Sequence, residues 1–397
     1  MNAKRLKLGW RVVKFGDVVR QCKEKVDRNN NPFERYVEGG HMDTENIHIR
    51  HWGLFGGDYV GPAFHRVFRK GQVLYGSRRT YLKKVASAEF DGVTANTTFV
   101  LESKDPKVFI QDLLPFLMLT KRFTEHSIRE SKGSTNPYIN WPDIAKFEFP
   151  LPPLEEQKRI AEILWAADEA MGCYVECFEN LASITNQYLR ESFKHFSAEM
   201  VPCKQLFEQK PRNGISPRPN PHGKGFPTLS IGAVRDGKVN ANGNMKYAEI
   251  SKSDLNKFRI SEGDIFVVRG NGNRKMCGKA GLVTEIPANC FYPDLLIKIV
   301  FDQNIILSEY AIAQWNHFAV HKKLLAFAKS TNGIWKISGK DLNQHRLIVP
   351  SMSVQEETVG RLKEIQKRAF FVNHHIENIS NLAEQSRNQV LEGKADV

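Results

Sequence analysis

The sequence predicts an α+β fold in which two α/β domains, residues 1–150 and 198–349, are separated by two long helices, 151–197 and 350–397. Three observations lead to this fold class. The chain contains an internal repeat at about half its length of 397 residues. Each repeat ends in a proline-free interval with heptad spacing. Each repeat begins with short apolar runs broken by Gly, Asn and Pro, as is typical of mixed α/β domains.

The repeat appears when the second half of the chain is shifted by 198 residues, so that Ile139 falls on Ile337. Further identities share this offset without a gap, and such self-similarity indicates a duplicated structural unit with a pseudo-two-fold relation. The further identities at this offset are Asp143 with Asp341, Pro152 with Pro350, Gln157 with Gln355, Leu164 with Leu362, Glu179-Asn180 with Glu377-Asn378, and Gln187 with Gln385.

The two long helices are predicted from the residues at the end of each repeat. No proline occurs between Pro153 and Pro202, and none follows Pro350, so both intervals permit continuous helix. Apolar residues recur there in alternating steps of four and three, which predicts that the two stripes pair as a coiled coil. The alternative is that each stripe packs on its own domain. The predicted seam consists of Ile160, Leu164, Met171, Phe178, Leu181, Leu362, Ile365, Val372, Ile376 and Ile379.

The two domains that precede the helices, called head 1 and head 2, share their ends but differ inside. In head 1 a short strand near 71–76 leads into the basic loop 77–84, and in head 2 a strand near 263–268 leads into the basic loop 269–275. Segments 131–139 and 329–337 also correspond. Because the two heads have matching end segments but different sequences between them, we expect each head to recognise a different ligand feature.

The charge of the chain indicates a polyanionic partner. The net charge is +13 with a pI near 9.3, and residues 210–224 contain five basic or histidine side chains and no acid. Arg and Lys neutralise phosphates, while Arg and Asn also pair with base edges, although any single basic residue can equally be a solvated surface charge. The candidate DNA-binding residues are Arg78, Arg79, Tyr81, Lys83, Lys132 and Ser134 in head 1, and Arg218, Lys224, Arg269, Asn271, Arg274, Trp335 and Lys336 in head 2.

No catalytic residue is predicted. The chain has no phosphate loop of the Gly-x-x-x-x-Gly-Lys-Ser/Thr type, and Asn136-Pro137-Tyr138 lacks a proline and the glycine-rich cofactor loop of amino-methyltransferases. The acidic pattern of Asp143, Glu156 and Lys158 matches many metal-dependent nucleases. Its second half falls on a predicted helix, so we interpret it as a coincidence.

No metal site is predicted either, because the histidine pairs His48/His51 and His317/His321 lack two further ligands nearby. The sequence has no run of about 20 apolar residues that could span a membrane, and its basic start is not followed by the apolar stretch of a secretion signal. We therefore expect a cytoplasmic protein without membrane contacts.

The run from Phe149 to Ile160, Phe-Pro-Leu-Pro-Pro-Leu-Glu-Glu-Gln-Lys-Arg-Ile, resembles a signature of the specificity (S) subunits of type I restriction–modification systems. Trp10–Val18 resembles the entry into the first target-recognition domain of that family, and Gly133–Ile144 resembles its exit. The resemblance covers essentially the whole chain. The second copy of the signature, Pro350–Gln355, lacks two of the prolines and the Glu-Gln pair.

The resemblance implies two target-recognition domains at opposite ends of an antiparallel pair of helices, each reading one half of a bipartite double-stranded DNA target. It also implies that the helices set the spacing and dock two modification (methyltransferase) subunits, which carry S-adenosylmethionine and methylate a flipped adenine. Restriction (motor and nuclease) subunits would use ATP and Mg. On this interpretation the chain itself has no cofactor and is not an enzyme.

Two other interpretations remain open at this stage. One is a self-contained DNA-recognising methyltransferase or nuclease, and the other is a basic coiled-coil protein that binds RNA or serves as an interaction module. The target sequence cannot be deduced, because base readout also depends on loop geometry and DNA shape.

Overall fold

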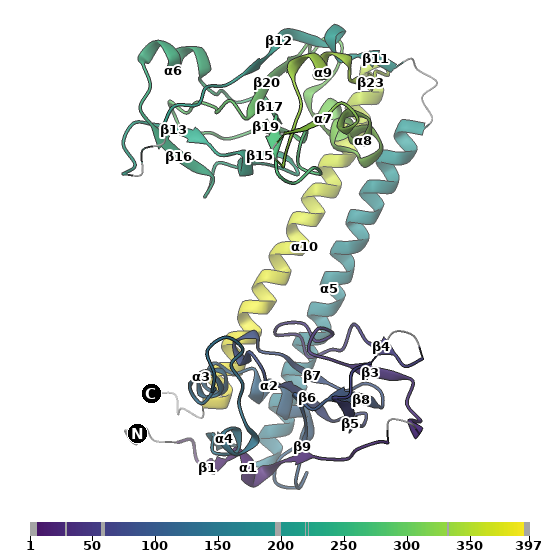
Figure 1. The fold of residues 1–397 in the computed structure, drawn as a ribbon, viewed down its shortest axis with the longest axis vertical. Coiled ribbons are helices and arrows are strands. Elements are labelled where there is room, and N and C mark those ends of the chain that lie inside the picture. Colours follow the sequence, from purple (N-terminus) through teal and green to yellow (C-terminus); the bar gives the residue numbers. More distant parts are fainter. Residues whose placement is uncertain are drawn as a thin grey trace. The chain divides into compact units, whose positions relative to one another are not determined.

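The computed structural model of the chain describes residues 6–27, 30–56, 60–194, 200–218, 220, 222–331 and 333–392. It divides into two compact units, shown in Figure 1. The first unit comprises Met1–Glu176 and Asn373–Val397, and the second comprises Cys177–Val372. Each unit therefore contains one head and a part of both long helices.

Head 1 contains two four-stranded sheets, ordered β2-β9-β6-β7 and β4-β3-β8-β5, and the two-stranded pair β1-β10. The strands are β1 (Arg11–Lys14), β2 (Val19–Cys22), β3 (Arg35–Val37), β4 (Gly53–Leu54), β5 (Phe64–Phe68), β6 (Val73–Gly76), β7 (Val85–Ser87), β8 (Gly92–Ala95), β9 (Thr98–Ser103) and β10 (Glu148–Leu151). The helices are α1 (Phe15–Val18), η2 (Thr80–Leu82), η3 (Gln111–Leu113), α2 (Leu114–Met118), α3 (Lys121–Arg129) and α4 (Trp141–Ala145).

The centre of head 1 is a sheet with apolar residues on both faces. In β6, Val73 and Tyr75 face a core shared with α2, α3 and the start of the first long helix, whereas Leu74 faces the second sheet. Because successive side chains of a strand point to opposite faces, a continuous apolar run is what a strand buried on both sides requires.

Head 2 contains the six-stranded sheet β12-β20-β17-β19-β15-β14, the three-stranded sheet β18-β22-β21, and the pairs β13-β16 and β11-β23. The strands are β11 (Met200–Pro202), β12 (Phe207–Asn213), β13 (Phe226–Leu229), β14 (Val234–Arg235), β15 (Gly237–Val239), β16 (Met245–Ala248), β17 (Ile265–Val268), β18 (Gly270–Asn271), β19 (Ala280–Val283), β20 (Leu296–Phe301), β21 (Lys329–Thr331), β22 (Ile334–Lys336) and β23 (Arg346–Ile348). The helices are η4 (Cys203–Gln205), η5 (Ile231–Ala233), α6 (Lys252–Phe258), α7 (Ser308–Asn316), α8 (Phe318–Leu325) and α9 (Gly339–Gln344).

The predicted internal repeat is visible in the strand order. The sequence β2-β9-β6-β7 in head 1 has the counterpart β12-β20-β17-β19 in head 2, and the pair β1-β10 has the counterpart β11-β23. The central strand β17 is also buried on both faces, with Ile265 and Val267 in one core and Phe266 and Val268 in the other. The heads diverge beyond this shared part: β3, β4, β5 and β8 form a second four-stranded sheet in head 1, whereas in head 2 β14 and β15 extend the main sheet and β13 pairs with β16.

The two long helices are α5 (Leu154–Lys194) and α10 (Met352–Glu392), each 41 residues long. They pair in both units with opposite chain directions, because the start of α5 lies in the unit that holds the end of α10, and the reverse holds in the other unit. In the first unit Tyr174 stacks on His375 with 5.4 Å between ring centroids. In the second unit the Arg361 guanidinium lies 5.9 Å from the ring of Tyr188. The predicted α+β fold class with two long helices is confirmed.

The predicted seam residues divide into two groups. Ile160 and Leu164 are buried in the core of head 1, and Val359, one turn before the buried Leu362, belongs to the core of head 2. Met171, Leu181, Ile365, Val372, Ile376 and Ile379 are half-buried, whereas Phe178 is exposed. The first turns of each long helix therefore pack into the core of the head that precedes the helix, as the alternative to a coiled coil predicted. The contacts between the two helices lie further along each helix.

A buried glutamine fastens the start of each long helix to its head. Gln157 donates from Nε2 to the carbonyls of Val108 (2.8 Å) and Pro152 (3.0 Å), and its Oε1 accepts from the Ile110 amide (3.0 Å). Gln355 makes the same three bonds, to Ile305 (3.1 Å), Pro350 (3.0 Å) and the Leu307 amide (2.8 Å). Both side chains are almost completely buried. The internal repeat thus duplicates this set of three hydrogen bonds, called the glutamine clamp, as well as the strand order and the long helix.

A histidine provides a second tie between head 1 and α5. His48 lies between Asp168 of α5, at 2.6 Å from Nε2, and Glu89, at 2.7 Å from Nδ1. The hydrogen bond to Asp168, helped by Glu89, raises the pKa of His48 above its ordinary value of 6.5 even though partial burial acts in the opposite direction. Protonation of His48 therefore strengthens the contact between the head and the helix.

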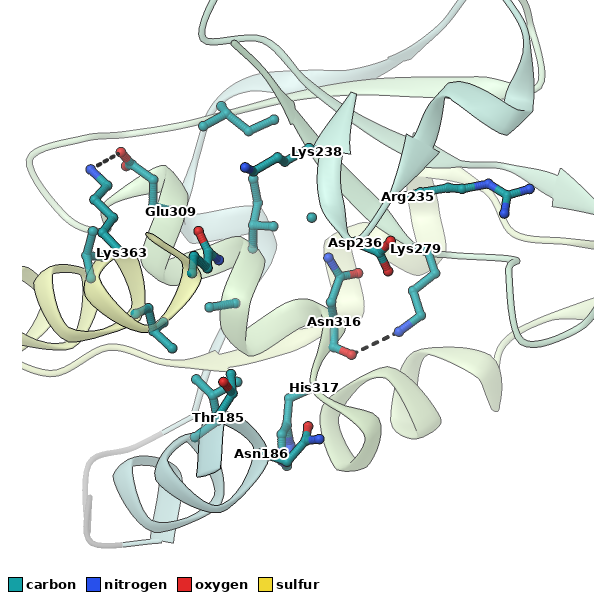
Figure 2. A pocket seen from close by; sticks show the side chains of 18 of the residues that line it. Thr185, Asn186, Arg235, Asp236, Lys238, Lys279, Glu309, Asn316, His317 and Lys363 are labelled. Carbon is teal, nitrogen blue, oxygen red and sulfur yellow. Dashed lines mark hydrogen bonds and ion pairs between the residues drawn. The ribbon is translucent and has the colours of Figure 1, made fainter. Parts of the chain in front are cut away.

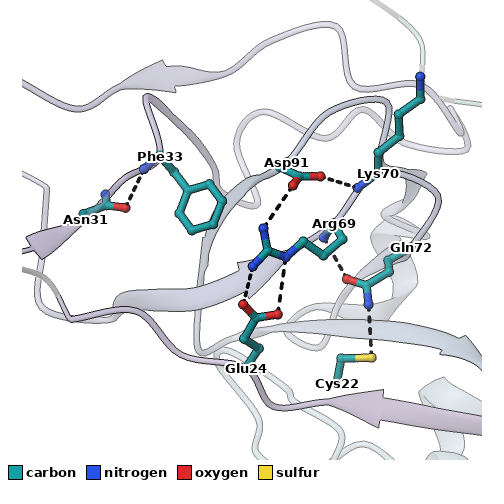
Figure 3. Close-up of polar contacts among 8 residues, drawn as sticks. All are labelled: Cys22, Glu24, Asn31, Phe33, Arg69, Lys70, Gln72 and Asp91. Carbon is teal, nitrogen blue, oxygen red and sulfur yellow. Dashed lines mark hydrogen bonds and ion pairs between the residues drawn. The ribbon is translucent and has the colours of Figure 1, made fainter.

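At the start of β6, a cluster around Arg69 joins three segments of head 1 (Figure 3). The Arg69 guanidinium pairs with Glu24 at 2.5 Å and with Asp91 at 3.0 Å, and it lies 5.1 Å from the Phe33 ring. The Lys70 amide also donates to Asp91, and these bonds lower the pKa of the Asp91 carboxyl. The charge of Arg69 is thus committed to internal contacts, at the end of β6 opposite to the basic loop 77–84.

None of the helices in the described part of the chain is both long and apolar enough to cross a membrane.

Replacing Gln157 with Met keeps the length of the side chain but leaves two buried carbonyls and one buried amide without partners. We expect the free energy of unfolding to fall by about 2–5 kcal/mol, measured by urea denaturation of the full chain. The matched control is Gln187→Met, since Gln187 is exposed on the same helix and its side chain donates to Glu191. A control that loses as much stability as Gln157→Met would refute the role of the clamp.

His48 predicts a pH-dependent stability. Because its pKa is raised in the folded protein, its contribution is complete below the ordinary value of 6.5 and is lost as the pH rises through the raised pKa. We expect the difference in unfolding free energy between the wild type and His48→Gln to be larger at about pH 5.5 than at about pH 8.5. In an Asp168→Asn background most of this pH dependence should disappear, and its persistence there would contradict the assignment.

Candidate nucleic-acid interface

In head 1 two loops meet at the end of β6 and form one surface. Loop 77–84 follows β6, and segment 131–139 leads from α3 to α4. The Arg79 amide donates to the Pro137 carbonyl (2.6 Å), and the Ile139 amide donates to the Ser77 carbonyl (2.9 Å). These backbone bonds make the two loops a single surface, called platform 1.

The exposed side chains of platform 1 combine cations with aromatic rings. The Arg78 guanidinium lies 5.8 Å from the Tyr138 ring, and both residues are exposed. Arg79, Tyr81 and Ser134 are also exposed. A guanidinium held by a ring keeps its hydrogen-bond donors for a ligand, because cation–π contact does not use them.

Two other predicted contacts of platform 1 are held by acids. Lys132 pairs with Asp143 at 3.0 Å, and this bond lowers the pKa of the Asp143 carboxyl. Lys83 pairs with Glu45, whose amide also donates to the Lys83 carbonyl. These lysines can still meet a phosphate, but only in competition with a carboxylate.

The backbone of platform 1 is strained. Arg79, Lys83 and Glu45 have φ angles of +49°, +47° and +57°, in the left-handed region that non-glycine residues rarely adopt. Such residues persist only where the surrounding structure determines them, and they concentrate at functional sites. Here the short 3-10 helix η2, with the Thr80 hydroxyl bonded to Ser131, fixes the loop between two strained residues.

Head 2 builds the corresponding surface, platform 2, from loop 269–275 and strand β22. Gly270 pairs with Lys336, Asn271 pairs with Trp335, and the Ile337 amide donates to the Arg269 carbonyl (2.9 Å). The bond from Ile337 to Arg269 corresponds to the bond from Ile139 to Ser77 in head 1. The two heads therefore carry the same loop frame at the end of equivalent strands, β6 and β17.

The side chains of platform 2 repeat the chemistry of platform 1 with different residues. The Arg274 guanidinium lies 4.5 Å from the Trp335 ring, and Arg274 and Lys336 are exposed. Arg269 is half-buried and contacts Asp294 through both a carboxylate oxygen (3.5 Å) and the carbonyl (3.2 Å). Asn271 uses its Oδ1 to accept from the Asn273 amide (2.8 Å), which shapes the turn.

The remaining two predicted residues lie on a different loop. Arg218 and Lys224 are exposed, and their segment joins platform 2 through Ser216, whose hydroxyl donates to Asp294, the partner of Arg269. Within the described residues, no contact brings Lys224 to platform 2. Instead, its neighbour Gly225 lies against the backbone of Ala248 in β16.

Sequence reasoning missed the residues that arrange these cations. Tyr138, which carries Arg78, stands inside the matched segment 131–139, so an aromatic in that repeat could have indicated it. The acids Glu45 and Asp294 are separated by 38 residues from Lys83 and by 25 from Arg269, and nothing local in the sequence links them.

The second unit also holds a cavity of about 840 Å³ between head 2 and both long helices (Figure 2). Its polar lining includes Lys238, Lys279 and the buried His317, whose pKa is lowered by burial. The Lys279 amine donates to the Asn316 carbonyl (2.9 Å), and Lys363 pairs with Glu309 (3.1 Å). Among the described residues, none of the predicted DNA contacts lines this cavity.

Part of the chain is similar to a known protein family. Residues 7–171 match the family model described as the type I restriction modification DNA specificity domain. The chain is 29% identical over 299 residues to the type I restriction enzyme EcoKI specificity subunit of Escherichia coli, a match over 68% of this chain and 64% of the relative. It is 21% identical over 203 residues to the HindI specificity subunit of Haemophilus influenzae, over 50% of this chain and 43% of the relative. These alignments thus span less than two thirds of either relative.

Two solved structures share the fold. One comes from work on complex assembly and conformational transition of the type I R-M system, with a TM-score of 0.62, 18% identity, and coverage of 98% of this chain and 100% of that chain. The other is the S subunit of a type I restriction–modification system from M. genitalium, with a TM-score of 0.61, 13% identity, and coverage of 100% and 98%. Residues 7–171 of the chain thus resemble the type I restriction modification DNA specificity domain, and the chain as a whole shares the fold of these two solved structures.

Proposed function

We propose that this chain is the DNA-recognising specificity subunit of a type I restriction–modification complex, and that each head reads one half of a bipartite double-stranded target. The observation that carries the proposal is the duplicated platform. Both heads place a guanidinium over an aromatic ring on the same loop frame, yet the side chains differ. A shared frame with different side chains is what reading two different half-targets requires.

The chain supplies recognition and assembly, and its partners supply the reactions. The basic charge of +13 suits the phosphate backbone of DNA, which dominates affinity without selecting sequence. Methylation with S-adenosylmethionine belongs to modification subunits, and ATP- and Mg-dependent translocation and cleavage belong to restriction subunits. On this proposal the length of the helices sets the gap between the half-targets, and the complex works in the cytoplasm, where it meets the chromosome.

The long helices offer docking surfaces for two copies of a modification subunit. In the first unit Leu382 of α10 is 61% exposed, and in the second unit Ile184 of α5 is 52% exposed. These two residues occupy equivalent positions of the repeat, 198 residues apart. Large apolar side chains exposed on a soluble surface mark interaction sites, and their duplication supports one partner copy for each repeat.

The test of recognition is a genome-wide map of adenine methylation in a host that expresses this chain with its modification subunit, compared with a host that expresses the modification subunit alone. We expect a split motif that appears only with this chain. The same motif without the chain would refute the proposed function.

Variants of the two platforms sharpen this test. Arg274→Ala should weaken binding to the mapped target by about 1–3 kcal/mol and relax the motif in one half only, and Arg78→Ala should affect the other half. Arg129→Ala is the matched control, since Arg129 is exposed on α3 and pairs with the neighbouring Glu130. If Arg78→Ala and Arg274→Ala relaxed the same half of the motif, the assignment of one half to each head would be wrong.

Docking is tested by co-purification and native mass measurement. We expect Ile184→Glu and Leu382→Glu each to reduce the number of bound modification subunits from two towards one, because a buried carboxylate is costly in an apolar contact. Ser183→Glu, exposed beside Ile184 on the same helix, is the control. Full occupancy by two copies in both apolar-to-Glu variants would rule out this surface.

A further inference from the structure

Head 2 contains a groove with a cavity volume of about 670 Å³ that belongs to neither long helix. Its walls are β12, the short helix η4 and the start of α9. β12 is an edge strand of the six-stranded sheet, and its pairing with β20 contains two register shifts on either side of Gln209, the second of which spans Pro211. Bulges and proline on an edge strand bend it away from flat pairing, which opens a groove at its side.

The groove gathers positive charge from three separate elements. Lys204 comes from η4, Lys210 and Arg212 come from β12, and Lys340 comes from α9. All four side chains are exposed, and Glu208 is the acid that lines the groove with them among the described residues. Four cations against one acid in a concave surface favour a polyanion over an isolated counter-ion, because the walls focus the potential.

Two of the neighbouring groups are held in place. The Arg212 guanidinium lies 4.8 Å from the Phe258 ring, which positions it without consuming its donors. Asp341, the acid in the first turn of α9, is engaged in a capping box, in which its carboxylate accepts from the Ser338 amide and hydroxyl, both at 2.8 Å. Asp341 thus caps the N-terminus of α9, which leaves the amine of Lys340 available to a ligand in the groove.

The groove and platform 2 are neighbours along the chain. Ser338 lines the groove, and the residue before it, Ile337, donates its amide to Arg269 in the platform loop. Lys336, the next residue back along the chain, pairs with Gly270. One short stretch of chain, residues 336–338, thus runs from platform 2 to the groove.

The wall of the groove that α9 supplies has a different counterpart in head 1. At the repeat offset of 198, Gly339 and Lys340 correspond to Trp141 and Pro142, and the ring of Trp141 packs against Phe15 at 6.1 Å. The equivalent helix α4 thus begins with two apolar residues where α9 begins with a glycine and a lysine. The glycine and lysine that α9 contributes to the groove are consequently specific to head 2.

We propose that this groove binds the sugar–phosphate backbone of double-stranded DNA beside the half-target read by platform 2, through Lys204, Lys210, Arg212 and Lys340. The inference rests on the proposed function and deepens it. It assigns to head 2 a grip on DNA that is independent of sequence.

The test compares a groove variant, Lys204→Gln/Lys210→Gln/Lys340→Gln, with a control variant, Lys252→Gln/Lys257→Gln/Lys322→Gln. The control removes three exposed lysines of the same unit, none of which lines the groove. The full chain, co-purified with its modification subunits, is titrated with a duplex that carries the mapped target and with a scrambled duplex of equal length. Both titrations are repeated over a series of salt concentrations.

We expect the groove variant to lose affinity for both duplexes by the same factor, roughly tenfold or more, with its preference for the target unchanged. The slope of log affinity against log salt should become shallower by about one for every lysine that contacts a phosphate. A slope equal to that of the control, or a loss confined to the target duplex, would overturn the inference. If the wild type showed no preference for the target, the proposed function would fail, while the salt slope would still decide the groove.

Discussion

The buried side-chain amide of one glutamine at the start of each long helix fixes the contact between that helix and its head, and the position of the platform depends on this contact. Gln157 and Gln355 each satisfy three backbone groups that are shielded from water, and in each unit these groups belong to the loop before a head helix and to the strand end that enters the long helix. A buried backbone group without a partner is expensive, so the clamp determines how each head is seated on its helix. The position of each platform depends on that seat.

Each head combines buried central strands with exposed loops whose side chains differ between the heads. The strands β6 and β17 are buried on both faces, which leaves little room to change them without creating cavities. The loops that follow these strands are exposed and are held by backbone bonds, so their side chains can differ while the frame persists. Tyr138 under Arg78 and Trp335 under Arg274 are two solutions on the same frame. Such a division allows recognition to change without a change of fold.

The positive charge of the chain is not equally available. Arg69, Lys83, Lys132 and Arg269 are held by carboxylates, whereas Arg78, Arg212 and Arg274 lie over aromatic rings that leave their donors open. An ion pair lowers the benefit of a new phosphate contact, because the partner acid must first be displaced. A cation–π contact fixes direction at little such cost. The kind of partner therefore affects how readily each of these cations is available to an anionic ligand.

The sequence by itself determined the features that depend on local periodicity. The repeat offset, the proline-free heptads and the strand-to-basic-loop transitions predicted the fold class and the two long helices, since these patterns are set by residues close in the chain. Only the tertiary structure decided which charges are paired, that Ile160 and Leu164 pack into head 1 while Phe178 is exposed, and that Lys204 and Lys340 meet across a groove. Those outcomes depend on residues brought together from distant positions, and no local pattern records them.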